Sequence, residues 1–193
     1  MQIQLSQKDD QLRRPTNNGL EAEEVYSYYG SDIPITTLNI EEQKQQLFGI
    51  CKMIQVQLKG GIERIAKIIR LVEADSGEPK SLFEEYEQKV WPIIVETDLH
   101  IKILANTVRQ TIDACNINER RLEWLLAIHK FQLKIEEMIR TLTTIVKDDI
   151  KRVLSLHVRC GKGRITGLHF NPNTIEVVQR MQNDIRIKSF ENN

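Results

Sequence analysis

Apolar residues recur every three or four positions through the middle of the chain, which is the period of an α-helix. The first such stripe consists of Leu47, Ile50, Ile54, Leu58, Ile62, Ile65, Ile69 and Val72. Gly60 and Gly61 lie inside it, and each costs a helix about 1 kcal/mol relative to alanine. Because the stripe keeps its register across the pair, we expect a weakened helix or the close approach of another helix, not a break. The sequence DSGEP at 75–79 predicts its end.

A second stripe follows at helical spacing. It consists of Phe83, Tyr86, Val90, Ile94, Ile101, Leu104, Val108 and Ile112. Ser81, with Glu84 three residues later, predicts a capping box at the start of this helix. Pro92 falls inside the stripe and predicts a kink there, because proline removes a hydrogen-bond donor and disfavours helix at Trp91. The short sequence 116–118 then predicts a tight connection, with Asn118 as the N-cap of the next helix.

The third stripe is the longest and is close to a heptad pattern. It consists of Leu125, Ile128, Gln132, Ile135, Ile139, Leu142, Val146, Ile150 and Val153. A continuous helix from Asn118 to Arg159 would be on the order of 60 Å long. Further apolar residues, Leu122, Leu126, Leu133 and Ile145, widen the apolar face beyond a two-stranded seam.

The two ends of the chain have a different character. Residues 1–39 are polar and irregular, which predicts a flexible arm. Within it, residues 20–35 mix acids with three tyrosines, which is compatible with a segment that docks on a partner, a phosphorylation target, or a short element lying on its own bundle. After Gly161, we expect short strands at 165–170 and 185–188, with a helix between them that starts at Asn171 and Pro172.

The sequence therefore predicts an all-α fold: an elongated antiparallel bundle of about three long, coiled-coil-like helices at 40–160. The arm at 1–39 precedes this bundle, and a small appendage of one helix and short strands follows at 161–193. With 40% hydrophobic and 28% charged residues, the composition is that of a folded chain. Nine glycines and five prolines are too few for a turn-rich β fold.

The overall charge favours no particular partner, since 27 cations balance 27 acids. The ends differ, however: residues 1–46 carry four cations and eight acids, whereas residues 151–193 carry eight cations and three acids. The three cysteines form no CxxC pair, and no signal peptide or long apolar run is evident. We therefore expect reduced cysteines and an intracellular location, cytoplasmic or nuclear.

The stretch VRCGKGRITGLHF at 158–170 is the most conspicuous candidate for chemistry. A phosphate-binding loop needs G-x-x-x-x-G-K followed by Ser or Thr, after a strand and before a helix. Here the stretch follows a helix, and Lys162 is followed by glycine. We interpret it as a helix end with cations near the negative end of the helix dipole, and less readily as a surface for an acidic partner.

Cations gather where the third helix is expected to end, and they suggest an alternative function in nucleic-acid binding. The patch consists of Lys147, Lys151, Arg152, Arg159, Lys162 and Arg164. No aromatic residue interleaves these cations to stack on bases, and Asp148 and Asp149 oppose them. A solvated helix face is the simpler interpretation.

Candidate metal ligands are sparse. His157 and Cys160 are three residues apart, and Glu96 and His100 are four apart, but neither pair has the further ligands that zinc or di-iron sites require. No nucleophile motif or dinucleotide-binding loop is present. We therefore expect no cofactor and no metal, and predict that the protein is not an enzyme, with a site assembled in the bundle core as the less favoured alternative.

The wide aliphatic faces predict a structural or adaptor subunit of a larger intracellular complex, which contacts other helical protein subunits through its helices. Cytoskeletal, cell-division, transcriptional and trafficking complexes all use such subunits, and the sequence favours none of them. The predicted partner-contact residues are Ile135, Ile139, Leu142 and Val146 on the third helix. The alternative for this stripe is that it lies wholly within the chain's own core.

Overall fold

The computed structural model describes residues 39–114, 119–160 and 169–185, and every regular element in these ranges is a helix. The predicted all-α class is confirmed for this part of the chain. The predicted short strands are not found where they can be checked: Phe170 has no regular structure, and Ile185 is the C-cap of a helix. The rest of both strands, the arm at 1–38 and the proposed cap Asn118 lie outside the described residues.

The first helix, α2 (Ile40–Glu73), begins with a capping box. The Asn39 side chain accepts the Glu42 backbone N–H, and the Glu42 carboxylate accepts the Asn39 N–H, both at 3.0 Å. The helix continues without a break through the glycine pair. Gly61 is buried, and a Cβ added there would lie 3.4 Å from Ile93 Cγ2 on a neighbouring helix. The expected close approach of another helix at this pair is confirmed.

The turn after α2 sets the start of the next helix, α3 (Pro79–Glu85). Gly77 has a φ of 88°, in the left-handed region that favours glycine. The N-cap is Glu78, whose side chain accepts the Ser81 N–H at 2.7 Å, and Pro79 follows at the first helical position. The prediction that Ser81 caps this helix was therefore wrong. Pro79, which the pattern predicts as a stop signal for the preceding helix, is the first residue of this one.

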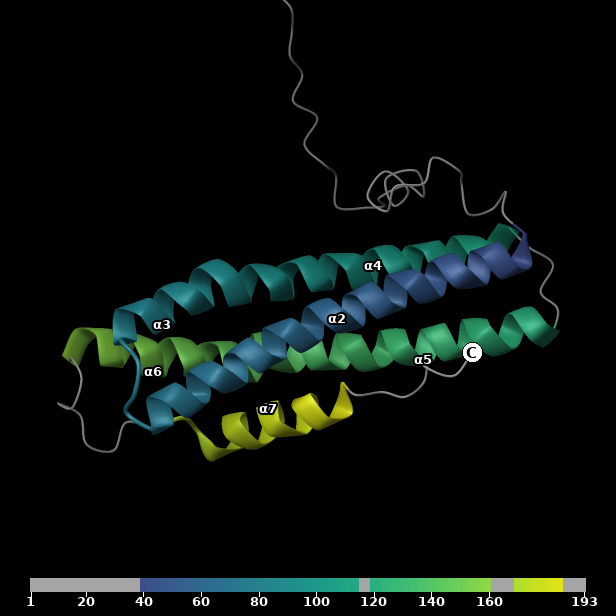
Figure 1. Ribbon diagram of the computed structural model, residues 1–193. Helices are drawn as coiled ribbons and strands as arrows, with labels where there is room; N and C mark the ends of the chain where they lie inside the picture. Colours follow the sequence, from purple (N-terminus) through teal and green to yellow (C-terminus); the bar gives the residue numbers. More distant parts are fainter. Residues whose placement is uncertain (1–38, 115–118, 161–168, 186–193) are drawn as a thin grey trace, which may run out of the picture.

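The helical path continues from α3 through a π-helical turn, η2 (Tyr86–Val90), into α4 (Trp91–Ala114). The Trp91 N–H bonds to the carbonyl of Tyr86, one residue further back than in an α-helix. This widened turn comes directly before Pro92, whose ring would crowd the carbonyl four residues earlier in a regular helix. The predicted irregularity at Pro92 thus takes the form of a π turn, and α3 lies at an angle to α4 (Figure 1).

The third helical unit consists of α5 (Glu119–Thr141), a second π turn, η3 (Leu142–Val146), and α6 (Lys147–Cys160). Its bounds are close to the predicted 118–159. The Lys147 N–H bonds to the Leu142 carbonyl, which again widens the helix by one residue. The sequence contains no proline here, so its pattern gave no sign of this second π turn.

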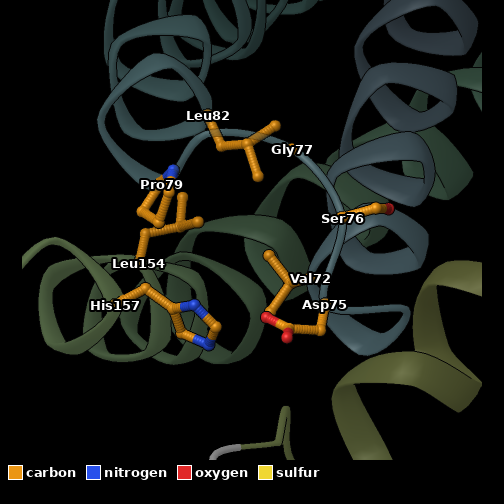
Figure 2. Close-up of a pocket in the computed structure, with 8 residues that line it drawn as sticks. All are labelled: Val72, Asp75, Ser76, Gly77, Pro79, Leu82, Leu154 and His157. Carbon is orange, nitrogen blue, oxygen red and sulfur yellow. The ribbon is translucent and has the colours of Figure 1, made fainter. Parts of the chain in front are cut away.

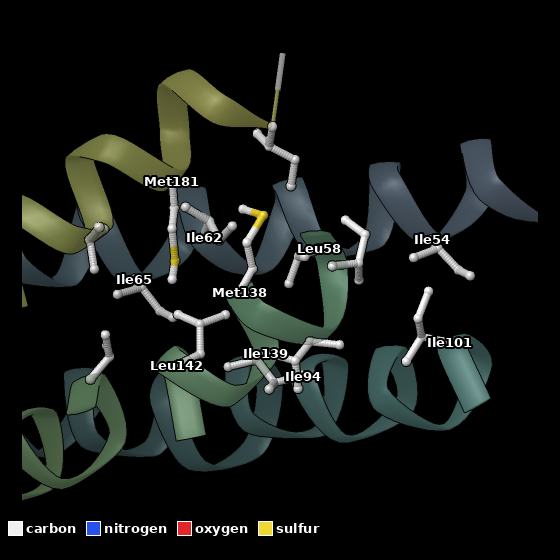
Figure 3. Close-up of a cluster of buried hydrophobic side chains, with 14 of the residues drawn as sticks. Ile54, Leu58, Ile62, Ile65, Ile94, Ile101, Met138, Ile139, Leu142 and Met181 are labelled. Atoms are coloured by element: carbon white, nitrogen blue, oxygen red, sulfur yellow. The ribbon is translucent and has the colours of Figure 1, made fainter. Parts of the chain in front are cut away.

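The three long helical units lie side by side, and the chain reverses direction from each to the next (Figure 1). The last described helix, α7 (Pro172–Asp184), runs along α2. Apolar side chains from these elements meet in one core, where Met181 of α7 points toward Ile62 of α2 and Met138 of α5 (Figure 3). The stripes predicted from the sequence supply most of this core.

Candidate interaction surfaces

The stripe predicted to contact a partner lies inside the molecule. Ile135, Ile139, Leu142 and Val146 have exposed fractions between 0 and 4%. All four belong to the hydrophobic core, in which Ile139 lies beside Ile94 of α4 and Leu142 lies near Ile65 of α2 (Figure 3). The structure therefore accounts for this stripe as internal core, which was the alternative interpretation. A partner that binds the folded chain would have to contact other residues of these helices.

The surface beside this stripe contains a groove of about 350 Å³ between α4 and the α5–η3 unit. Trp91, Ile94, Val95 and Asp98 line it from α4. Glu136, Ile139, Arg140 and Thr143 line it from the other side. Ile94 and Ile139 are buried and form its floor, whereas Val95 and Arg140 are exposed on its edges.

Exposed aliphatic residues extend along both edges of the groove. On α4, Val95 and Leu99 are one turn apart, with exposed fractions of 51% and 45%. On α5, Leu126 and Leu133 are two turns apart and are 49% and 51% exposed. Residues with spacings of four and seven share one face of a helix. Because Leu133 lies three residues before Glu136, it is on the ridge next to the groove.

The polar groups around the groove carry both signs of charge. Asp98 pairs with Lys102 on α4 at 2.6 Å, and the Gln132 side chain donates to Glu136 on α5 at 3.1 Å. Arg140 adds a cation on the α5 edge. The groove therefore has an apolar floor and edges of mixed charge, without a net field that would select an anionic or a cationic ligand.

The described cations of the predicted basic patch are largely engaged within the chain. Lys147 lies over the Trp91 ring, with its Nζ 4.0 Å from the ring centroid. Lys151 pairs with Glu87 at 3.0 Å. Arg152 pairs with Asp149, and it also donates to the His169 carbonyl at 3.2 Å.

Of the rest of this patch, Arg159 is exposed at the end of α6, and Lys162 and Arg164 lie outside the described residues. The engaged cations join α6 to the η2–α4 region and to His169, three residues before α7 begins. They therefore hold elements together, and the face that they form offers few free charges to phosphates.

The histidines of the two pairs considered as metal ligands, His157 and His100, lie in different surroundings. His157 lines a recess of only about 10 Å³ with Asp75 and Leu154, at the turn between α2 and α3 (Figure 2). The space is that of about one water molecule. His100 is buried, and its Nδ1 lies 2.9 Å from Oε1 of Gln57 on α2. Within the described ranges, no group of three or more His, Cys, Asp or Glu residues is placed to hold a metal ion.

Burial shifts the pKa values of titratable groups in the core, and Cys51 and His100 are the two that could matter for chemistry near neutral pH. Desolvation raises the pKa of the Cys51 thiol to about 12, so this cysteine is protonated and unreactive at neutral pH. Desolvation lowers the pKa of His100, while the nearby Glu96 acts in the opposite direction. Neither group faces one of the recesses described above, so burial alone explains both shifts and neither indicates catalysis.

No protein-family model, curated protein or solved structure matches this chain. In the part of the chain that the structure describes, no helix is both long enough and apolar enough to cross a bilayer. The groove between α4 and α5 is thus the surface feature on which a functional argument can be built, and the sequence signal for it was weak. In the sequence pattern, Leu126 and Leu133 only widen the apolar face of the third stripe.

Proposed function

We propose that the protein is a non-enzymatic structural or adaptor subunit of a larger intracellular complex, and that it receives a helix of another protein in the groove between α4 and α5. The observation that carries this proposal is the run of exposed aliphatic residues, Val95, Leu99 and Leu133, beside a groove with an apolar floor. Exposed apolar residues that adjoin one another on a surface are typical of protein interaction sites.

A helix is the occupant that this surface fits best. The exposed residues follow helical spacing along two antiparallel ridges, and a third helix packs into such a groove through its own side-chain ridges. The molecule contains an example of this packing, because α7 lies along α2 and contacts η3. A partner helix would place aliphatic residues against Val95 and Leu99 and charges of both signs toward Asp98 and Arg140.

Nucleic-acid binding is the weaker alternative on these observations. The three cations that α6 contributes near its start already contact Trp91, Glu87 and Asp149. Releasing them for phosphates would break contacts between helices. We therefore do not propose this function.

The experiment is an affinity purification of the tagged full-length chain from native extract, with the size and stoichiometry of the recovered particle measured. The test variant is Leu99→Glu with Leu133→Glu, and the control is Lys67→Glu on the exposed face of α2. We expect a protein recovered with the wild type in fixed stoichiometry to be retained by the control and lost from the double variant. Retention by the double variant, or a monomer without partners, would overturn the proposal.

A further inference from the structure

The last described helix, α7, is held at its beginning by side chains that bind its backbone. The Glu73 carboxylate at the end of α2 accepts the Phe170 N–H at 3.0 Å. The Asp149 carboxylate on α6 accepts the Asn171 N–H at 2.7 Å. Both acceptors are anionic and lie where a helix presents free N–H groups and the positive end of its dipole.

The end of α7 is held in the complementary way. The Gln55 side chain on α2 donates to the Ile185 carbonyl at 2.8 Å, and Lys134 on α5 donates to the Asp184 carbonyl at 3.2 Å. Donors therefore meet the free carbonyls, and a cation lies at the negative end of the dipole. Every residue has a backbone carbonyl, and every residue except proline has a backbone N–H. The four side chains therefore recognise the two ends of a helix and not a particular sequence.

Between these ends, α7 contributes a simple apolar face. Val177, Val178, Met181 and Ile185 are buried, and Phe170 is buried just before the helix (Figure 3 shows Met181). Residues at spacings of three, four and seven or eight form such a face in any amphipathic helix. A helix of this length is marginal by itself in water, so α7 owes its helical state to the surface beneath it.

One buried residue of α7 fits that surface poorly. The side chain of Thr174 is buried, yet its Oγ1 has no hydrogen-bond partner among the described residues. A hydroxyl buried in this way costs free energy that an aliphatic side chain of the same shape would not. A helix with valine at this position would therefore bind the same surface more tightly than α7 does.

We propose that the surface under α7, between the two pairs of end-binding side chains, is a second helix-binding site, with α7 as its resident occupant. Its ligand in trans is an amphipathic helix of about the length of α7, with aliphatic residues or methionine at the buried spacings. Side chains that bind both ends of the helix favour a ligand of that length. They are Gln55, Glu73, Lys134 and Asp149. This site is separate from the groove between α4 and α5, and its test does not depend on that surface.

The test uses a full-length chain in which α7 cannot dock, Val178→Glu with Met181→Glu, and a fluorescent, amidated peptide of residues 169–185. Fluorescence anisotropy reports binding. We expect the variant chain to bind this peptide, and the wild-type chain to bind it at least about 100-fold more weakly, because the resident helix competes at a millimolar effective concentration.

Three peptide variants provide the matched controls. A peptide with the same two glutamates should not bind. Gln179→Ala, on the exposed face, should leave the affinity unchanged. Thr174→Val should bind about tenfold more tightly, because it removes a buried, unpaired hydroxyl. A variant chain that keeps its helical circular dichroism but binds no peptide, or binds the glutamate peptide equally well, would overturn the proposal.

The end-binding side chains have their own test. Adding Gln55→Ala and Glu73→Ala to the variant chain should weaken binding of the peptide by about tenfold or more, whereas Lys67→Ala on the exposed face of α2 should not change it. If the Lys67→Ala control lost as much peptide affinity as the Gln55→Ala, Glu73→Ala chain, these side chains would not recognise the helix ends.

A second arm covers the case in which the variant chain does not fold. A protease site placed within residues 161–168 is cut after the wild-type chain has folded, and an excess of labelled peptide is then added. We expect the labelled peptide to replace the cleaved segment while the helical signal is kept. Failure to exchange, or loss of helical structure on cutting, would overturn the proposal.

Discussion

The molecule contains two grooves of the same kind, and only one of them is filled. On one side, α7 covers the surface beside α2 and η3, so that Ile62, Ile65 and Met138 are buried. On the other side, nothing among the described residues covers the groove between α4 and α5, and Leu99 and Leu133 are about half exposed. Both surfaces are built from aliphatic residues at helical spacing. The comparison shows that an apolar helix face indicates that another element packs there. It does not indicate whether that element belongs to the same chain or to a partner.

The polar groups differ more than the apolar ones. Around α7, side chains from three helices aim at backbone groups, so they have a defined ligand in the structure. Around the open groove, Asp98 pairs with Lys102 within α4, and Glu136 accepts a hydrogen bond from Gln132 within α5. The filled groove therefore specifies where its helix begins and ends. The open groove specifies only an apolar face and leaves the length and direction of its occupant undetermined.

The largest effect is expected from Phe170→Ala, which removes the most buried aromatic contact of the α7 segment. The loss of unfolding free energy should be about 3–5 kcal/mol, which is the usual cost of a phenylalanine-to-alanine change at a buried position. Chemical denaturation measures it. Asn173→Ala, exposed in the first turn of α7, is the control. A loss below about 1 kcal/mol would mean that α7 contributes little to the fold.

The next largest effect on stability is expected from substitutions of Gly60 and Gly61, the glycine pair of α2 beside α4. Gly60 has no atom within 4 Å of an added Cβ, so Gly60→Ala should stabilise the chain by about 1 kcal/mol through helix propensity alone. Gly61→Val should destabilise it, because the branched side chain would press on Ile93. Thermal unfolding of both variants checks the opposite signs. Equal shifts would contradict the close approach of α2 and α4.

A pH effect of smaller size is expected at the same interface. Burial lowers the pKa of His100 in the folded chain below its ordinary value near 6.5, so the unfolded chain binds the proton more readily. The stability that neutral His100 contributes is complete above about pH 6.5 and is lost as the pH falls below it. Denaturation at pH 7.5 and 5.5 should show a smaller loss for His100→Gln than for the wild type. Identical pH dependence would contradict a buried, neutral His100.

The sequence pattern predicted the helices well because a long apolar stripe at helical spacing fits few structures other than a helix. The all-α class, the ends of the third helical unit near Asn118 and Arg159, and the close approach at Gly61 all follow from local periodicity and composition. The helix at Pro172 was also expected. The cap at Ser81 was wrong because Glu78 and Pro79 supplied an earlier and equally favourable start.

The candidate surfaces were much harder to predict. Ile139 and Leu133 look alike in the pattern, and only the packing of α2 and α4 decides that one is buried and the other half exposed. The side chains that hold α7 come from residues as much as 130 positions away in sequence, as Gln55 and Ile185 show. A single sequence carries no local signal for such contacts. The second π turn, η3, likewise lacks a proline or glycine that would have marked it.

The smallest effect on stability is expected in the open groove, and it separates the two surfaces most directly. Leu99→Lys and Leu133→Lys replace half-exposed side chains, so each should change the unfolding free energy by less than about 0.5 kcal/mol. Val178→Glu, at an almost fully buried position under α7, should cost several times more, because it places a charge in the core. Denaturation of the isolated chain measures all three. If the lysine variants were as destabilising as Val178→Glu, Leu99 and Leu133 would be covered by the chain itself in solution. Both grooves would then be covered by the chain itself, and the partner helix would have no surface to bind.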